Sequence, residues 1–389
     1  MRVTGIIAEY NPLHNGHVYQ LSMVKDAGAD AIVVALSGNF VQRGEPAVFD
    51  KWTRTKLALD AGADLVIEIP TLWCLADASK YAKGGVSVLE SLGLCEQIAF
   101  GSESGDVSEL MAVANNLCEN REYFASKIKD YASEGLSYPK AREKAYIEKF
   151  GKTSSVLASS NDILGLEYIM ASNTLSPLVI QRVGANYNDA INNNEYQSAS
   201  GIREALRQGK DVSSYIPNGL DYSEALLGWD NLFDMARILI LNTDSSVIDE
   251  CPSGGEGLGN RLKEAIRTSS NFNELIEATK SKRYTYTRIS RLLMQLLLGI
   301  DRLEYQYVDV PYLRVLGFND KGRELMAFAS KNELNSKPFI TNVNKNANEL
   351  SKEDRAVLEL DLKASDVYNL ILGRNIKDYS DNLRRPVIK

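Results

Sequence analysis

Cysteine is scarce in this sequence, and the four that occur lie far apart. Cys74, Cys95, Cys118 and Cys251 form no CxxC pair, and neither of the two histidines lies near any of them. Structural zinc sites need such ligands at short, regular spacings. We therefore expect no cysteine-based zinc site and interpret the four cysteines as small core or surface residues.

Long apolar runs are also lacking. The longest helical one, LLMQLLLGI at 292–300, is shorter than the roughly 18 residues of a membrane span and lies among arginines. Met1-Arg2-Val3-Thr4 leads directly into a strand-like run, without the basic and apolar regions of a signal peptide. The expected location is therefore cytoplasmic, with no membrane as a partner.

An excess of positive charge is missing as well, because the net charge is −7. This argues against a protein that binds nucleic acid through its overall charge. The distribution is uneven, however, since residues 260–291 hold eight basic side chains against three acidic ones. This local surplus is a candidate surface for a polyanion, and the alternative is an ordinary solvated helix face.

The first 210 residues do contain a regular alternation of strand and helix patterns. Five short apolar runs predict buried strands at 3–10, 31–38, 64–70, 96–103 and 177–183. Helical spacing separates the first four, and a longer helical stretch at 106–172 is expected to pack beside the sheet. Runs that are apolar throughout are typical of parallel strands covered on both faces. The predicted fold class is α/β, a Rossmann-like doubly wound parallel sheet of the nucleotide-binding type.

Helical patterns dominate the second half. We expect a domain at 1–213 that contains the sheet and a mainly α-helical domain at 214–389. Within the second domain, 308–343 predicts a small αβ element, and CPSGGEGLG at 251–259 predicts a flexible or turn-rich connector. The final RRPVIK is interpreted as a tail.

Both histidines lie in EYNPLHNGH, at residues 9–17, where the first predicted strand ends and a helix begins. Parallel α/β sheets bind ligands at such ends, and a helix N-terminus favours an anion. Gly16 leaves room near the backbone, and the spacing of His14 and His17 lets both side chains reach one bound group. Imidazole N–H groups can stabilise charge that develops on a phosphate. The motif predicts a nucleotide phosphate site; a histidine metal site is the alternative, with Glu9 as the one further ligand in view.

Two motifs resemble those of the nucleotidylyltransferase superfamily. HNGH resembles the HxGH signature, and SASGIREAL at 198–206 resembles the (I)SST-x-IR motif. In that motif hydroxyls and an arginine at a helix N-terminus hold the triphosphate, which implies Ser198, Ser200 and Arg203 here.

Longer stretches resemble the bacterial tRNA(Met) cytidine acetate ligase family. They are IIAEYNPLHNGH, LSGNFVQRGEPA, FGSES, SSNDILGLEY, QRVGANYND and SKRYTYTRISRLLMQLLLGI. The resemblance covers essentially the whole chain, and GNFVQRGEPA is far more specific than HxGH. The family uses ATP to activate acetate as acetyl-adenylate. It then transfers the acetyl group to N4 of the wobble cytidine of elongator tRNA(Met), which gives N4-acetylcytidine.

The resemblance implies that 1–213 is the catalytic, ATP-binding domain and that 214–389 binds tRNA. It also implies roles for particular residues. His14 and His17 are the expected catalytic residues. The expected ATP-binding residues are Ile7, Ala8, Glu9, Tyr10, Asn11, Pro12, Leu13, His14, Asn15, Gly16, His17, Val18, Tyr19, Gln20, Gly101, Asn161, Arg182, Val183, Ser198, Ser200 and Arg203. Asn39, Gln42 and Arg43 are candidates for acetate, because GNFVQRG combines a tight turn with polar donors. Mg²⁺ is expected with the triphosphate, without a dedicated metal site in the protein.

For tRNA, the candidates are Lys282, Arg283, Arg288 and Arg291. A helix is predicted from about Tyr286, with Arg288 and Arg291 on one face and Ile289, Leu292, Leu293 and Leu296 on the other. Tyr284 or Tyr286 would stack on an unpaired base. The alternative is that these cations pair with Glu274, Glu277 and neighbouring acids.

Two other functions fit the same motifs. One is a small-molecule adenylyltransferase that acts on a phosphomonoester, and the other is a non-catalytic RNA-binding protein. The roughly 175 residues after residue 213, with their basic segment, favour a macromolecular acceptor. Retention of both motif histidines favours catalysis. The oligomeric state stays open.

Overall fold

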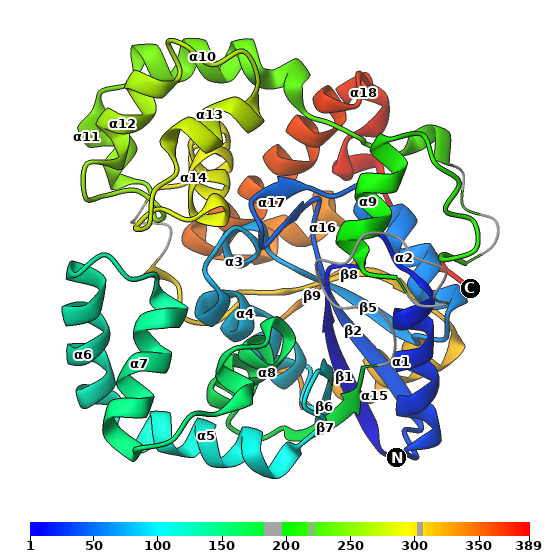
Figure 1. Ribbon diagram of the computed structural model, residues 1–389. Helices are drawn as coiled ribbons and strands as arrows, with labels where there is room; N and C mark the ends of the chain where they lie inside the picture. Colours follow the sequence, from blue (N-terminus) through cyan, green and yellow to red (C-terminus); the bar gives the residue numbers. More distant parts are fainter. Residues whose placement is uncertain (183–196, 218–219, 221, 302–305) are drawn as a thin grey trace.

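The computed structural model describes residues 1–182, 197–217, 220, 222–301 and 306–389. Its centre is a sheet with the strand order β10-β8-β5-β2-β1-β6-β7, in which β9 also pairs with β8 (Figure 1). The strands are β1 Val3–Ala8, β2 Ala31–Ser37, β5 Leu65–Ile69, β6 Cys95–Ser102, β7 Ser176–Gln181, β8 Leu313–Phe318, β9 Phe339–Ile340 and β10 Val387–Ile388. A separate hairpin pairs β3 Phe40–Val41 with β4 Glu45–Pro46.

The five strands predicted in the first half are confirmed, and β1, β2, β5, β6 and β7 are parallel to one another. Alternate residues of β2 enter two different cores. Ala31, Val33 and Ala35 face one core, whereas Ile32, Val34 and Leu36 face the other. Because both faces are covered, the strand is apolar throughout rather than alternating. The doubly wound α/β fold follows from this pattern.

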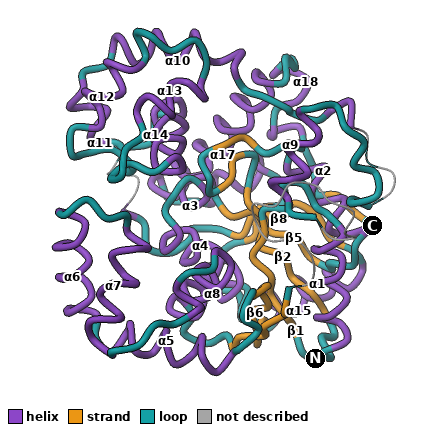
Figure 2. The backbone as a smooth tube through the Cα atoms, in the orientation of Figure 1, coloured by secondary structure: helices purple, strands orange, loops and turns teal. Residues whose placement is uncertain are grey.

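Helices cover both faces of the sheet (Figure 2). They are α1 Asn15–Asp26, α2 Lys51–Asp60, α3 Thr71–Cys74, α4 Ala78–Ser91, α5 Val107–Glu119, α6 Arg121–Ser133, α7 Tyr138–Phe150, α8 Ser160–Ala171, α9 Ala199–Arg207, α10 Phe233–Asn242, α11 Ser245–Glu250, α12 Leu258–Ala265, α13 Phe272–Thr279, α14 Tyr286–Leu298, α15 Asp320–Lys331, α16 Val343–Asn346, α17 Lys352–Ile371 and α18 Ile376–Tyr379. The helices α1 and α2 contribute to one core, and α4 and α8 contribute to the other. The stretch 106–172 packs beside the sheet as expected, because α8 contacts both α4 and β6.

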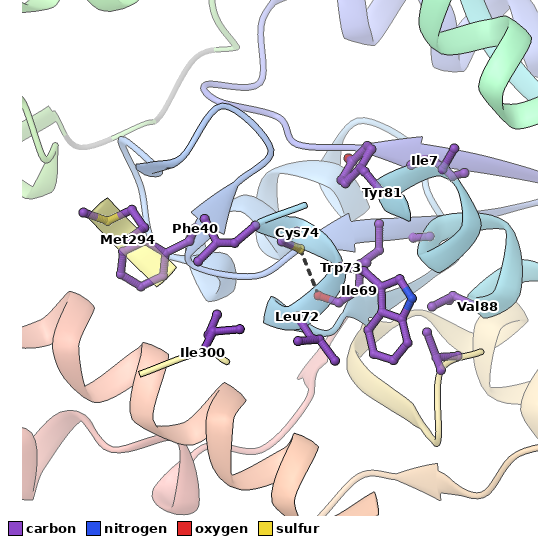
Figure 3. Packing of buried hydrophobic residues seen from close by; sticks show 14 of the residues in the cluster. Ile7, Phe40, Ile69, Leu72, Trp73, Cys74, Tyr81, Val88, Met294 and Ile300 are labelled. Atoms are coloured by element: carbon purple, nitrogen blue, oxygen red, sulfur yellow. Dashed lines mark hydrogen bonds between the residues drawn. The ribbon is translucent and has the colours of Figure 1, made fainter. Parts of the chain in front are cut away.

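The larger core continues from the sheet into the helices of the second half. Ile69, Leu72 and Trp73 lie in it, together with Met294 and Ile300 (Figure 3). The Cys74 thiol is buried and donates to the Ile69 carbonyl oxygen at 3.2 Å. All four cysteines are free. None of the helices in the described part of the chain combines the length and apolar character needed to cross a membrane.

The second half corrects two predictions. The element at 308–343 is not separate from the central sheet, because β8 pairs antiparallel with β5. RRPVIK is not a tail, because Val387 and Ile388 form β10 and pair with β8. Without these strands β5 would be an unpaired edge with exposed N–H and C=O groups. The segment expected as a mainly helical domain at 214–389 therefore completes the sheet begun by 1–213, and α10 to α14 gather at one end of the molecule (Figure 1).

Candidate active site

A cavity of about 490 Å³ opens at the carboxyl ends of β1, β6 and β7. The strand order reverses here, because β2 and β5 lie on one side of β1 while β6 and β7 lie on the other. Doubly wound sheets bind ligands in the crevice at this switch point. Its walls come from the β1–α1 segment, the 42–43 turn, α8 and the beginning of α9. The volume suits a ligand of nucleotide size.

His14 and His17 both line the cavity and orient each other at the start of α1. His14 is the N-cap rather than a residue of the first turn, and its Nδ1 accepts the Gly16 N–H at 3.1 Å. His17 Nδ1 in turn accepts the His14 N–H at 3.3 Å. The two rings stack with their centroids 3.8 Å apart. The structure thus confirms that the two side chains converge.

Both imidazoles are neutral. Burial lowers the pKa of His14 to about 3, and the nearby Arg182 and Arg203 act in the same direction. Burial likewise places the pKa of His17 well below its usual value, with His14 and Arg182 contributing. Because each Nδ1 accepts a hydrogen bond, each ring proton sits on Nε2. Neither Nε2 bonds to another described residue, so both N–H groups are available to a ligand.

The lining of the cavity includes three cations, Arg43, Arg182 and Arg203. Arg203 donates to the Asn11 carbonyl oxygen at 2.7 Å, which ties α9 to the β1–α1 turn. Ser198 caps α9 by accepting the Gly201 N–H at 3.0 Å. The N-termini of α1 and α9 therefore meet three guanidinium groups, an arrangement suited to phosphates.

Another part of the lining is mostly apolar and aromatic. Phe100, Ile163, Leu164 and Tyr168 line it, and the rings of Phe100 and Tyr168 meet edge to face at 5.9 Å. Asn161 Nδ2 donates to Glu103 Oε1 at 2.5 Å, which fixes the amide at the start of α8. Such a surface suits a nucleoside. Sequence reasoning assigned no role to these four residues although they lie in the FGSES and SSNDILGLEY stretches, because apolar residues at these positions also fit an ordinary core pattern.

Most of the predicted ATP-binding residues lie around this cavity. Those that line it are Ile7, Ala8, Glu9, Tyr10, Asn11, His14, Gly16, His17, Tyr19, Gln20, Gly101, Asn161, Arg182, Ser198 and Arg203. Pro12, Leu13, Asn15, Val18 and Ser200 are not part of its lining. Leu13 is buried in the core, and Asn15 instead donates to the Ser214 carbonyl oxygen at 2.9 Å. Val183 lies outside the described residues.

The three residues predicted to bind acetate do not lie together. Gln42 and Arg43 line the cavity, and the Gln42 N–H donates to Glu9 Oε1 at 2.9 Å. Asn39 is buried away from it: its Oδ1 accepts the Lys51 N–H at 2.8 Å, and its Nδ2 donates to Ser365 Oγ at 3.3 Å. The structure therefore does not bring Asn39 to the cavity.

The basic face predicted for α14 is largely absent. The helix begins at Tyr286 as predicted, but Arg291 is buried and donates to the Gln42 carbonyl oxygen at 3.2 Å. Arg288 donates to the carbonyl oxygens of Ser253 and Gly254 and pairs with Glu256 at 3.1 Å. Of the two descriptions predicted for 251–259, flexible or turn-rich, the structure supports the turn-rich one.

The segment before α14 also differs from expectation. Tyr284 is buried, and its hydroxyl donates to the Glu256 carbonyl oxygen at 2.6 Å, so it does not present its ring for stacking. Arg283 pairs with Glu256 at 3.0 Å but stays 45% exposed, and Lys282 is exposed. The alternative pairing with acids occurs for Arg283 and Arg288, but their partner is Glu256. Glu277 instead pairs at 3.1 Å with Lys280, which is not one of the four candidates.

The fold and site define a nucleotidyltransferase in which the turn between β1 and α1 carries the HxGH histidines at the switch point of the sheet. The family model described as HIGH Nucleotidyl Transferase matches residues 1–382, and the chain belongs to this family.

Relatives with full-length matches carry a more particular name. The tRNA(Met) cytidine acetate ligase of Clostridium perfringens is 39% identical over 100% of both chains. The protein of that name from Clostridium novyi is 37% identical over 100% of this chain and 99% of its own.

Two solved structures of Thermotoga maritima TmcAL cover 100% of this chain and 99% of their own. The one bound with alpha-thio ATP has a TM-score of 0.88 at 28% identity. The apo form has a TM-score of 0.90 at 29% identity.

Proposed function

We propose that this protein is an ATP-dependent, AMP-forming tRNA(Met) cytidine acetate ligase. It activates acetate as acetyl-adenylate and transfers the acetyl group to N4 of the wobble cytidine of elongator tRNA(Met). The observation that carries the proposal is the cationic cavity around the HNGH histidines, in a chain that matches relatives of this name over its full length. The solved relative bound with alpha-thio ATP supports ATP as the nucleotide.

In this proposal the cavity divides into two parts. The Nε2–H groups of His14 and His17 donate to the α-phosphate as acetate oxygen attacks it and pyrophosphate leaves, and they stabilise the charge that develops. Arg182, Arg203 and the N-terminus of α9 at Ser198 hold the remaining phosphates. The adenosine lies against the apolar part of the lining, which includes Phe100 and Tyr168. Gly101 also lines the cavity, beside the Arg182 side chain.

Acetate lies beside the 42–43 turn, where the Gln42 side chain and the Arg43 guanidinium line the cavity. Mg²⁺ arrives with the triphosphate and is held by phosphate oxygens and water. The chemistry of the lining supports this, because Glu9 is the one carboxylate among the described lining residues, and an all-protein magnesium site needs more oxygen ligands.

For tRNA, the exposed Lys282 and Arg283 remain the candidates of the basic segment. The Arg283–Glu256 pair is half exposed, so phosphate can compete for this guanidinium at little cost. A cytoplasmic location fits this substrate.

Mass spectrometry of nucleosides from elongator tRNA(Met), incubated with the protein, ATP and acetate, tests the proposal. N4-acetylcytidine at the wobble position, with stoichiometric AMP and pyrophosphate, is the expected result. A His17→Ala variant is the control, because it removes one phosphate donor and should lose the product. A dinucleotide product formed without acetate would instead indicate the small-molecule adenylyltransferase, and absence of ATP turnover would refute both.

A further inference from the structure

Acetyl transfer to an amine releases a proton, and the two histidines do not accept it. Each Nδ1 is occupied by a backbone N–H, and each Nε2 carries the ring proton. A second proton on His14 is strongly disfavoured, because burial lowers its pKa to about 3. Both imidazoles are therefore hydrogen-bond donors in this site, and a proton acceptor has to be found elsewhere.

Most of the other groups that line the cavity cannot serve as the proton acceptor. Arg43, Arg182 and Arg203 are cationic donors. The phenols of Tyr81 and Tyr168 are neutral, because burial raises each pKa well above its usual value. Glu9 is the one carboxylate that lines the cavity within the described chain.

Glu9 is held in a defined position at the end of β1. Its Oε1 accepts the Gln42 N–H at 2.9 Å, so the carboxylate lies against the turn proposed to hold acetate. Its Oε2 accepts no hydrogen bond from any residue that the structure describes. One oxygen thus anchors the group while the other is available to a substrate proton.

In its surroundings, the Glu9 carboxylate takes up a proton more readily than an exposed glutamate does. Burial raises the pKa of Glu9, whereas the Gln42 N–H and the cations Arg43, Arg203 and Arg54 limit the rise. Arg43 comes from the turn, Arg203 from α9 and Arg54 from α2, and the neutral Tyr81 and Tyr168 complete the surroundings from α4 and α8. A carboxylate with a raised pKa is a stronger general base.

We propose that Glu9 Oε2 accepts the proton that the cytidine N4 amine loses as it attacks the acetyl-adenylate. This inference rests on the proposed function. The N4–C bond forms, the bond between the acetyl carbon and the phosphate oxygen breaks, and AMP leaves with that electron pair. The proton then passes from Glu9 to solvent, which returns the carboxylate for the next turnover.

Glu9→Gln tests this step, because its amide oxygen still accepts the Gln42 N–H while the proton acceptor is gone. Acetate activation is followed by acetate-dependent exchange of pyrophosphate into ATP, and transfer is followed in a single turnover from preformed acetyl-adenylate to tRNA. We expect transfer to fall by about 10²-fold or more, the usual contribution of a general base, and exchange to fall far less. The rate of transfer by the wild-type protein should rise with pH as Glu9 loses its proton and then reach a plateau. Glu9→Gln should not show this titration.

Glu45→Gln is the matched control. Glu45 acts electrostatically on both Arg43 and Arg203, as Glu9 does, but does not line the cavity. If Glu45→Gln reproduces the selective loss of transfer, the effect belongs to the arginines and the inference is wrong. Equal loss of exchange and transfer in Glu9→Gln, or a changed magnesium requirement for exchange, would also overturn it. A wild-type protein without acetate-dependent exchange would refute the proposed function itself.

Discussion

His14 combines two roles that a single substitution can separate. It caps α1 through Nδ1 and presents Nε2–H to the cavity. Asparagine is among the best N-cap residues, so His14→Asn should keep the helix start, but its short side chain does not replace the Nε2–H donor. We expect acetate-dependent pyrophosphate exchange to fall by about 10²-fold, the cost of one transition-state donor, with a nearly unchanged melting temperature. His14→Ala should lose the same activity and about 1 kcal/mol of stability besides. Exchange within about threefold of wild type in His14→Asn would contradict the catalytic role.

The buried neutral state of His14 also has a consequence for stability against pH. In the unfolded chain a histidine titrates near pH 6.5, whereas burial lowers the folded pKa of His14 to about 3. Between these values the unfolded state binds the extra proton, so the free energy of unfolding falls as the pH drops below about 6.5. The slope is at most about 1.4 kcal/mol per pH unit for this residue.

His14→Asn removes this contribution. Urea unfolding at several pH values between 7.5 and 4.5 should therefore show wild type losing stability more steeply than the variant below pH 6.5. Curves that stay parallel would show that His14 titrates normally in the folded protein.

Among the elements, α14 shows what the spacing of apolar residues predicts about a helix and what it does not. Its start and its apolar residues Ile289, Leu292 and Leu293 are as predicted, because local spacing determines them. The opposite face of α14 packs against a segment that is distant in the sequence. Ser290 Oγ donates to the Gly44 carbonyl oxygen at 2.7 Å. Gly44 has φ 82°, and an added Cβ would lie 2.2 Å from the Arg291 backbone nitrogen. A helix pattern indicates that a face exists, but not that a turn from another part of the chain covers it.

The segment just before α14 gives a prediction about tRNA. Lys282→Glu with Arg283→Glu changes two exposed side chains and should weaken tRNA binding in a salt-dependent way, with a normal melting temperature. Arg288→Glu should instead lower stability, because it leaves the Ser253 and Gly254 carbonyl oxygens without their donor and places two carboxylates together. Filter binding at two salt concentrations, with thermal melts of each variant, separates these effects. Unchanged binding by the double variant would remove this segment from the tRNA surface.

At the scale of the whole molecule, the sequence predicts the five parallel strands well because each is a continuous apolar run. It does not predict that β8 and β10 return to the sheet, although β8 begins only at Leu313 and β5 ends at Ile69. The apolar run that forms β8 fits a small separate element equally well, because a short apolar run does not indicate which strand it will pair with. The site follows the same division: HNGH and SASGIREAL mark the phosphate side, whereas Phe100 and Tyr168 reach the cavity only through the packing of β6 and α8.

A buried ionic cluster joins these distant parts of the chain. Lys51 of α2 lies 2.6 Å from both Glu68 of β5 and Asp381 near the C-terminus. Arg314 of β8 lies 3.1 Å from Glu68 and 3.2 Å from Asp381. Asp381 also accepts the Trp52 indole N–H at 3.0 Å. All four charged side chains are at most 3% exposed, so removing any one leaves an uncompensated charge in the interior.

Asp381→Asn is therefore expected to be among the most destabilising conservative changes in the chain. Burial alone would raise the pKa of Asp381, but the charges of Lys51 and Arg314 hold it below its usual value, so the carboxylate is ionised at neutral pH. Asparagine keeps the shape and an acceptor for Trp52, yet leaves Lys51 and Arg314 with Glu68 as their remaining ion-pair partner and Asp361 as a further carboxylate nearby, at an expected cost of about 3–5 kcal/mol. Denaturant unfolding measures this cost.

Glu359→Gln, which breaks the exposed pair with Arg355, is the control and should change stability by less than about 1 kcal/mol. If the two variants were equally stable, the cluster would not hold the C-terminal strands to the sheet, and the two halves would be joined by apolar packing alone.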